Sequence, residues 1–217
     1  SPEARKKFWL DRKKTAAISK HTNAFKINED VVIPLPRMAE YTDGIERINI
    51  ELSLRNKLAL LDALEAFLRK GSLPLGKSDD AVEIASAELL EDSVAQALAL
   101  IGRVRALWQR WLSHLDTPSG QRPVPDQGTP TAGPEDDRTY FAQLQDRTLR
   151  ASWKLQVRAP LQSIFSGASL SPILEACQKI HAEVLHGRVW IALHMHAGDG
   201  NVHTNIPVNS DDYDMLQ

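Results

Sequence analysis

The sequence is short of cysteine, of long apolar runs and of excess charge, and each shortage excludes a class of protein. Its one cysteine, Cys177, excludes an internal disulfide framework and a cysteine-ligated iron–sulfur cluster within the chain, and suits a reducing cytosolic compartment. No apolar run approaches the roughly 18 to 20 residues of a membrane helix. The net charge of -2 gives no argument for a nucleic-acid partner. We therefore expect a cytoplasmic protein, free or peripheral to a membrane, with no membrane span.

Helical periodicity fills much of the chain. A first helix is expected over residues 3–20, where a few apolar side chains stand among many basic ones. A long helix is predicted from Met38, and Gly71 ends it. Its apolar residues recur every three to four positions, as on the buried side of an amphipathic helix: Ile45, Ile48, Leu52, Leu58, Leu61, Leu64 and Leu68.

A second long helix is predicted after a short turn, and Asp79 and Asp80 can cap its first turn. Its apolar residues show the same spacing: Ile84, Leu89, Val94, Leu98, Ile101, Leu107, Trp108 and Leu112. Two long helices joined in this way are expected to pack as an antiparallel pair, each burying one stripe.

A proline-rich segment interrupts the helical region. Residues 117–137 hold five of the chain's 12 prolines and almost no apolar residue, which predicts a flexible loop or a disordered linker. A third helix is predicted over about 138–158, ending before Pro160. A fourth is predicted over about 171–186, with Pro172 in its first turn.

The last part of the sequence is a predicted hairpin that holds three of the chain's seven histidines. An apolar run precedes a turn of Gly, Asp, Gly and Asn, and a second apolar run follows it. Side chains alternate along a strand, so His194 and His196 share one face, as do His203 and Asn205. A hairpin can bring these faces together. Imidazoles on the two sides of the turn can then reach one divalent cation.

This hairpin resembles a motif in the C-terminal domain of FAD-linked oxidases, the family of D-lactate dehydrogenase, D-2-hydroxyglutarate dehydrogenase and the glycolate oxidase flavoprotein subunit. The motif is His-x-Gly-Asp-Gly-Asn-x-His, and the matching residues are His196, Gly198, Asp199, Gly200, Asn201 and His203. The resemblance implies that the two histidines hold a divalent metal and that Asn205 helps to hold the substrate. Zinc is the first choice for imidazole ligands, with iron or manganese as alternatives. His194 lies outside the motif, and we expect it to support a ligand or to pack beside one, with a role as a metal ligand as the alternative.

A weaker resemblance to the same family extends to the N-terminus. Related enzymes carry a Trp-x-x-Arg helix, an aromatic-Lys pair and an Asp-containing strand that ends in proline. The residues that follow this order are Trp9, Arg12, Phe25, Lys26, and Asp30 through Pro34, with a short spacing difference before Asp30. The resemblance implies that Arg12 and Lys26 bind the substrate carboxylate, with Thr15 as a hydroxyl contact. A guanidinium suits this role because it can grip a carboxylate with two parallel hydrogen bonds.

The spacing of these motifs departs from the family pattern. The family domain usually passes through one helix before its histidine motif, whereas roughly 100 or more helical and loop residues intervene here. We expect residues 1–50 and 187–217 to belong to the family domain and residues 51–186 to form a helical insertion. The insertion is expected to be a structural buttress or a homodimer interface, with docking of an electron-acceptor protein as the alternative. Because the chain begins at Ser1 without methionine and stops soon after the motif, we interpret it as a piece of a larger polypeptide.

The resemblance implies an oxidoreductase that oxidises a D-2-hydroxy acid, such as D-lactate, by transferring the C2 hydride to FAD with help from the metal. It also implies that FAD is bound mainly by a domain outside this chain. A later Glu-His-Gly segment would supply the remaining metal ligand and the base, so this chain alone is expected to be inactive. Two alternatives stay open: a flavin-linked oxidase of an aryl alcohol or a sugar, and a non-catalytic helical interaction module with a structural histidine hairpin.

The fold class predicted from these elements is α+β and mostly α, with a small antiparallel sheet of the ferredoxin-like kind. The strand at about residues 30–35 is expected to pair with the closing hairpin, despite their separation in the sequence.

Overall fold

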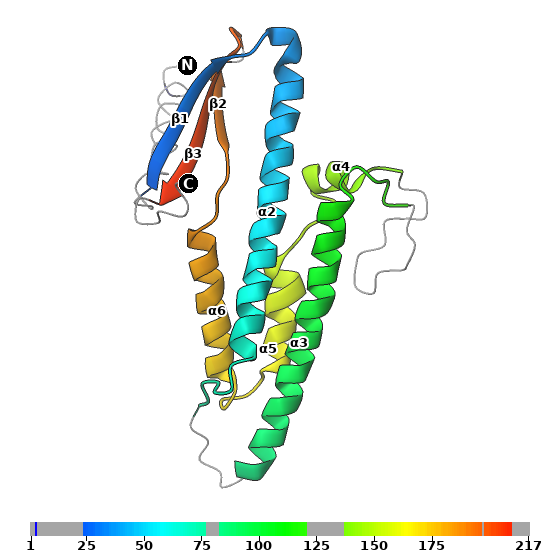
Figure 1. The fold of residues 1–217 in the computed structure, drawn as a ribbon, viewed down its shortest axis with the longest axis vertical. Helices are drawn as coiled ribbons and strands as arrows, with labels where there is room; N and C mark the ends of the chain where they lie inside the picture. The colour runs from blue at the N-terminus through cyan, green and yellow to red at the C-terminus, as the bar shows by residue number, and fades with distance from the viewer. Residues whose placement is uncertain (1–2, 4–23, 77–82, 121–136, 197, 210–217) are drawn as a thin grey trace. The chain divides into compact units, whose positions relative to one another are not determined.

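The computed structural model describes residues 3, 24–76, 83–120, 137–196 and 198–209. These residues form an α+β fold that is mostly helical and contains a three-stranded antiparallel sheet, so the predicted fold class is confirmed (Figure 1). The chain divides into two compact units. Residues 1–45 and 189–217 make up the sheet unit, and residues 46–188 make up the helical unit.

The sheet unit is built from one N-terminal strand and the C-terminal hairpin. Its strands are β1 (Ala24–Val32), β2 (Ala192–His196) and β3 (Asn201–Asn209), in the order β1-β3-β2. The central strand, β3, is antiparallel to both neighbours. The predicted pairing of the N-terminal strand with the hairpin is therefore confirmed. The strand begins earlier than expected and ends before Pro34, because proline has no N–H to donate to a ladder.

The two faces of the sheet differ because side chains alternate along each strand. On one face, Val202 and Val208 of β3 are buried. On this same face, the Thr204 hydroxyl lies 3.0 Å from the Tyr41 hydroxyl, near the start of α2 (Met38–Leu68). The first turns of α2 thus lie on the apolar face. His203 and Asn205 alternate with these residues and belong to the other, polar face.

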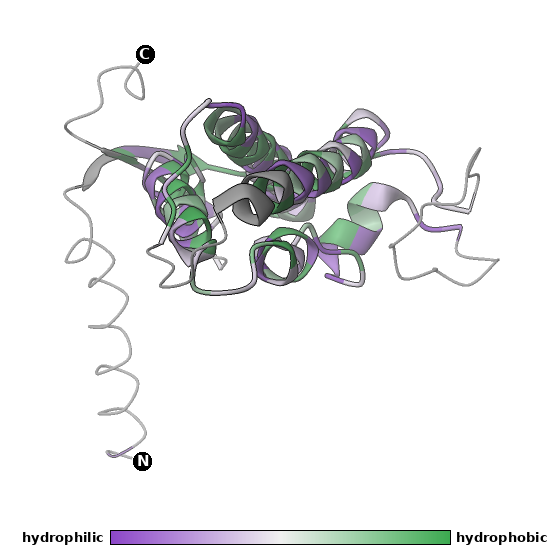
Figure 2. Ribbon diagram, turned by 90° about the horizontal axis from the view of Figure 1, so that it is seen from below, coloured by the Kyte–Doolittle hydropathy of each residue, from purple (hydrophilic) through white to green (hydrophobic). Residues whose placement is uncertain are grey.

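The helical unit consists of most of α2 and the helices that follow it. They are α3 (Glu83–Ser113), α4 (Tyr140–Gln145), the π-helical η3 (Trp153–Arg158), α5 (Ala159–Ile164) and α6 (Ser171–His186). In Figure 1, α2, α3, α5 and α6 run alongside one another. Each long helix carries both hydrophobic and hydrophilic residues (Figure 2). A bundle lets such helices bury their apolar sides together.

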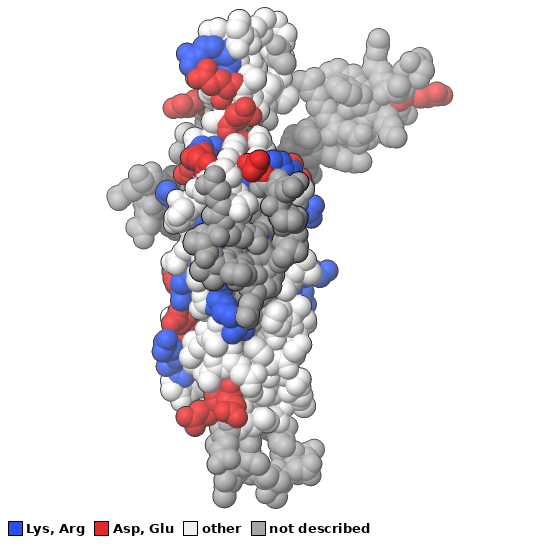
Figure 3. Space-filling view, turned by 90° about the vertical axis from the view of Figure 1, so that its right-hand side faces the viewer, with Lys and Arg blue, Asp and Glu red and all other residues white. Residues whose placement is uncertain are grey.

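Ion pairs between helices supplement this packing. Arg105 of α3 bridges Asp62 and Glu65 of α2. Arg47 holds Asp116 through two hydrogen bonds of 2.7 and 2.8 Å. Because Asp62 and Asp116 are exposed, these pairs contribute only about 0–1 kcal/mol each to stability. On the face shown in Figure 3, acidic and basic side chains are interspersed over the described residues.

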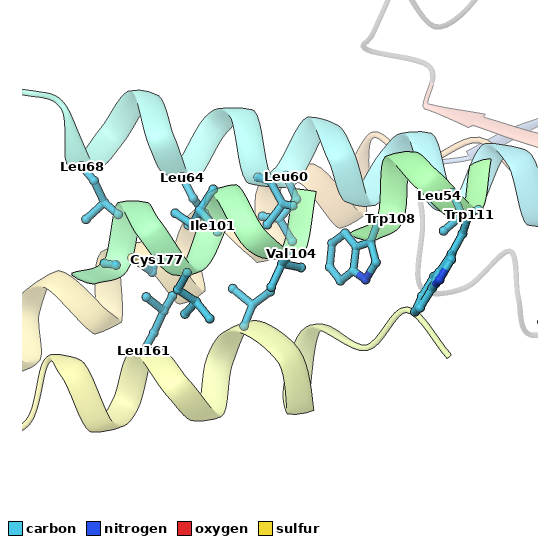
Figure 4. Packing of buried hydrophobic residues seen from close by; sticks show 14 of the residues in the cluster. Leu54, Leu60, Leu64, Leu68, Ile101, Val104, Trp108, Trp111, Leu161 and Cys177 are labelled. Carbon is cyan, nitrogen blue, oxygen red and sulfur yellow. The ribbon is translucent and has the colours of Figure 1, made fainter. Parts of the chain in front are cut away.

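The core of the helical unit joins α2, α3, α5 and α6 (Figure 4). Fully buried members include Leu61, Leu64, Ile101, Trp108, Leu161 and Cys177. Full burial of one large apolar side chain stabilises a fold by about 1.5–3 kcal/mol. The helical periodicity predicted part of this core: Leu61, Leu64, Leu68, Ile101 and Trp108 are buried, and Leu58, Val94, Leu98, Leu107 and Leu112 are half-buried against it. It was wrong for Ile48 and Leu89, which are 43% and 59% exposed.

The helix predicted over about 138–158 is wrong in its bounds. Its first part is the short α4, which ends at Gln145 with Asp146 as its C-cap, and Arg147 then adopts a left-handed φ of 65°. Helical structure resumes at Trp153, runs through one π-helical segment and continues past Pro160 into α5. A proline is tolerated there because it stands in the first turn of α5, and the π-helical turns change the hydrogen-bond pattern just before it.

The other predicted helices agree with the structure where it describes them. The helix from Met38 is α2, and the predicted fourth helix is α6, with Pro172 in its first turn and Gly187 at its end. The helix expected over residues 3–20 and the capping pair at 79–80 lie outside the described residues, as does most of the segment 117–137. Among the helices that the structure describes, none is long and apolar enough to span a membrane.

Candidate metal and substrate site

The sheet register brings three histidines together on the polar face. His194 of β2 lies directly opposite His203 of β3, so their side chains project from the same face. His196 is two residues beyond His194 on β2 and therefore shares that face too. His194, which the motif does not include, thus lies on the same face as the two histidines of the motif.

The three imidazole rings form an almost equilateral triangle. The ring centroids of His194 and His196 are 5.7 Å apart, those of His194 and His203 are 5.9 Å apart, and those of His196 and His203 are 5.7 Å apart. The His194 and His196 residues are exposed, and the His203 side chain is 31% exposed. Three rings that are accessible and this close can face a common ligand.

Asp30 of β1 orients one of these rings. It lies opposite His203 in the sheet, and its carboxylate Oδ1 is 2.5 Å from His203 Nδ1. In this contact the imidazole Nδ1–H donates to the carboxylate, which leaves Nε2 with its lone pair for another partner. A carboxylate that holds the far nitrogen of a metal-binding histidine is a common arrangement around metal ions. The two partners are 173 residues apart in the sequence, so sequence reasoning missed this contact.

Asn205, the predicted substrate contact, lies on the same face as His203, two residues further along β3. Its amide Nδ2 donates to the His203 carbonyl oxygen at 3.4 Å, and the side chain is half-buried. Lys26 stands opposite Pro207 in the register of β1 and β3, and its side chain lies outside what the structure describes. Arg12 and Thr15 also lie outside the described residues. The structure thus brings His196, His203 and Asn205 to one face of the sheet.

The glycine turn has a fixed conformation. Gly200 adopts a φ of +78°, and a Cβ at this position would lie 2.2 Å from the carbonyl oxygen of Ile33. The Gly200 carbonyl accepts a hydrogen bond of 2.8 Å from the Ile33 N–H. The Asp199 carboxylate accepts a 3.0 Å hydrogen bond from the Asn201 N–H and so closes the turn. The turn residues of the motif therefore hold the hairpin against the end of β1.

The donors on this face suit a divalent cation. Neutral imidazole is a preferred ligand of zinc, copper, iron and nickel. Among the described residues, no three His, Cys, Asp or Glu side chains already stand in positions to hold a metal ion. Imidazoles that share one metal, with metal–nitrogen bonds of about 2.0–2.1 Å, have ring centres roughly 5–5.5 Å apart. The observed centroid separations, 5.7 to 5.9 Å, are slightly larger than this spacing.

Comparisons of the chain with protein-family models, with curated proteins and with solved structures find no significant match. The resemblance to FAD-linked oxidases therefore remains a prediction that rests on the motif.

Proposed function

We propose that this chain is the substrate- and metal-binding part of an FAD-dependent oxidoreductase that oxidises a D-2-hydroxy acid. The observation that carries the proposal is the placement of His196, His203 and Asn205 on one polar sheet face. Alternation of apolar and polar residues explains why the sheet has one polar face. Any polar residues would satisfy that alternation, whereas this face carries histidines and an asparagine. This composition is what binding a cation and a small polar substrate needs.

The proposed cation ligands are His196 and His203, with Asp30 keeping His203 in the tautomer whose Nε2 is available. A divalent cation at this place would polarise the substrate hydroxyl and lower its pKa. Zinc is the first choice, and iron or manganese are the alternatives.

The proposed substrate contacts lie along the same face and at the N-terminus. Asn205 would hydrogen-bond to the substrate beside the cation. Arg12 and Lys26 would bind its carboxylate, with Thr15 as a further hydroxyl contact. A carboxylate bound by cations on one side and a hydroxyl held on the other would fix which hydrogen of C2 is presented for transfer. This arrangement favours a 2-hydroxy acid over an aryl alcohol or a sugar, which would leave the basic residues without a carboxylate partner.

FAD would be bound mainly by a domain outside this chain and would accept the hydride from C2. We therefore expect the chain by itself to bind a metal without turning over substrate. The helical unit would serve as a buttress, as a dimer interface or as a docking surface for an electron acceptor. The residues of its core all belong to the helical unit itself, which favours the role of a structural buttress among these three roles.

Metal titration tests the proposal on the chain as it stands. Isothermal calorimetry with Zn²⁺ should give binding at about micromolar affinity, and the double variant His196→Ala, His203→Ala should lose it. His186→Ala is the matched control, because His186 is exposed at the end of α6 in the helical unit. Equal binding by the double variant and the control would contradict the proposed ligands. It would favour a non-catalytic helical interaction module whose histidine hairpin is structural.

Activity must be tested in a protein that joins this chain to its FAD-binding domain. We expect oxidation of D-lactate or D-2-hydroxyglutarate, with little activity on the L-enantiomer, and loss of most turnover in the His203→Ala variant. Turnover that is unaffected by this substitution would refute the proposed role of the hairpin.

A further inference from the structure

We propose that His194 is a third imidazole donor to the cation, so that the hairpin alone supplies a three-histidine site. This inference rests on the metal site of the proposed function and goes beyond it, because the motif assigns only His196 and His203 to the metal. A three-histidine set needs no further protein ligand and leaves one position open for substrate.

The register places His194 where a third donor is needed. It lies directly across from His203 and two residues before His196, so it is the neighbour of both on one face. In an antiparallel pair, residues directly opposite have Cβ atoms about 4.5–5.5 Å apart, which is close enough for two side chains to share one ion.

Two of the three ring pairs are closer than their backbone positions require. His196 lies opposite Asn201 and is therefore diagonal to His203. Diagonal neighbours are separated by about 7–8 Å, whereas these two ring centroids are 5.7 Å apart. His194 and His196 are about 6.6–6.8 Å apart along the strand, and their ring centroids are also 5.7 Å apart. Both differences show that the His196 side chain leans toward the other two rings, while the directly opposite rings of His194 and His203 stay 5.9 Å apart.

Exposure distinguishes this cluster from aromatic rings that pack in a core. Elsewhere in the chain, Trp153 and His181 form a true stack, with centroids 4.4 Å apart and planes 9° apart. His194 and His203 form a wider stacked pair, with centroids 5.9 Å apart and planes 28° apart, and His196 meets both rings edge-on, at 88° and 79°. His194 and His196 are exposed and fill no core. Three accessible imidazoles fit a shared polar ligand better than an apolar cluster.

The three rings differ in burial and in hydrogen bonding, and this difference also fits metal binding. His203 is held by Asp30 and is the more buried of the three rings. His194 and His196 have exposed side chains, and neither has a hydrogen bond to a protein group among those that the structure describes. The fixed ring would set the position of the cation, and the two exposed rings are able to close on it by the roughly half ångström that separates the observed spacing from that of a bound set.

Single substitutions separate the third donor from the other two. The 217-residue chain and its His194→Ala, His196→Ala and His203→Ala variants would be titrated with Zn²⁺ by calorimetry, with His186→Ala as the control. We expect one site in the unmodified chain and at least about tenfold weaker binding in each of the three variants. Hydrogen exchange of the Val202 amide would verify that the hairpin stays folded, and His194→Gln would repeat the test with a side chain of similar size.

A spectroscopic measurement adds a readout that a supporting role would not change. Long-range ¹H–¹⁵N spectra of the imidazoles, recorded with and without Zn²⁺, should show metal-induced shifts at one ring nitrogen of His194 as well as at those of His196 and His203. Co²⁺ should give a visible spectrum that changes in the His194→Ala variant, because the donor set has changed.

The outcomes distinguish the two proposals. If His196→Ala and His203→Ala weaken binding but His194→Ala does not, the inference is refuted and the proposed function stands. If the unmodified chain binds no Zn²⁺, the three histidines do not suffice, and the inference fails while a site completed by a ligand from another segment remains. If all variants bind like the control, both the inference and the proposed metal site are wrong.

Discussion

Replacing Gly200 with alanine tests whether the turn must have glycine at this one position. The residue has a φ of +78°, which costs an alanine about 1–2 kcal/mol. The added Cβ would also lie 2.2 Å from the Ile33 carbonyl oxygen. This oxygen belongs to the backbone and cannot swing aside, so relief requires the end of β1 to shift, at a further cost of about 1–3 kcal/mol. We expect Gly200→Ala to destabilise the sheet unit by roughly 2–5 kcal/mol.

Gly198 in the same turn provides a matched control. It has no left-handed φ, and a Cβ there would meet no atom within 4 Å. Gly198→Ala should therefore be neutral or stabilise slightly, by up to about 1 kcal/mol, through the lower entropy of the unfolded chain.

Amide hydrogen exchange is the most direct assay of this effect. The Ile33 N–H donates to the Gly200 carbonyl, so its protection reports the contact between the turn and β1. Protection of Ile33 should fall strongly in Gly200→Ala and persist in Gly198→Ala, with the same order of stability in urea unfolding. Equal protection in both variants would refute the argument from φ and close approach.

Three further predictions concern separate parts of the chain. Asp30→Asn should weaken Zn²⁺ binding about tenfold or more without unfolding the sheet. Glu29→Gln, which alters the neighbouring residue on the other face, should leave Zn²⁺ binding unchanged. Calorimetry on both variants tests this prediction. Leu64→Ala should lower the free energy of unfolding by about 2–5 kcal/mol because Leu64 is fully buried, and Leu89→Ala should change it by less than about 0.5 kcal/mol in urea titrations. Burial raises the pKa of the Cys177 thiol from its ordinary 9.0 to about 12. Since the folded chain holds this proton more tightly than the unfolded chain, the stability from this group is complete below about pH 9 and is lost as the pH rises toward 12. Thiol-reactive reagents should accordingly modify Cys177 at pH 8 only after unfolding, and rapid labelling of the folded chain would contradict this.

The long helices and the hairpin could be predicted because they are encoded locally. Regular apolar spacing marks α2 and α3, and a glycine turn between two apolar runs marks the hairpin. Periodicity says which side of a helix is apolar, but it does not say how far the partner helix extends. This is why Ile48 and Leu89 are exposed although they continue the apolar stripe.

Helix ends without a glycine or a proline could not be predicted in the same way. The left-handed Arg147 ends the helical region that contains α4, and no residue near it is a usual helix stop. Pro160 predicts a helix end when it follows a helical pattern, although a proline is also favourable in a first turn, where it stands in α5. A single sequence does not distinguish these two positions of a proline.

The placement of the two motif histidines on one face could be predicted from the sequence, whereas the contact between Asp30 and His203 could not. The motif identified His196, His203 and the turn, because their spacing is local. The contact of Asp30 with His203 depends on the register between two strands far apart in the chain, and a shift of one residue would put Asp30 on the other face. Because the motif omits His194, the sequence favours a supporting place for it over a ligand role, and the proposed ligand role rests on the distances between the rings.

The position of β1 in the sheet also sets the order in which the chain assembles. Asp30 and His203 are separated by 173 residues, and closing an unstructured loop of that length costs about 4–5 kcal/mol in chain entropy. The β2–β3 hairpin needs no such closure and forms locally within microseconds. We therefore expect β1 to join late, after the intervening helices have folded and shortened the effective loop. Before β1 pairs, the hairpin already holds its three histidines together. A cation could therefore bind the hairpin before Asp30 contacts His203.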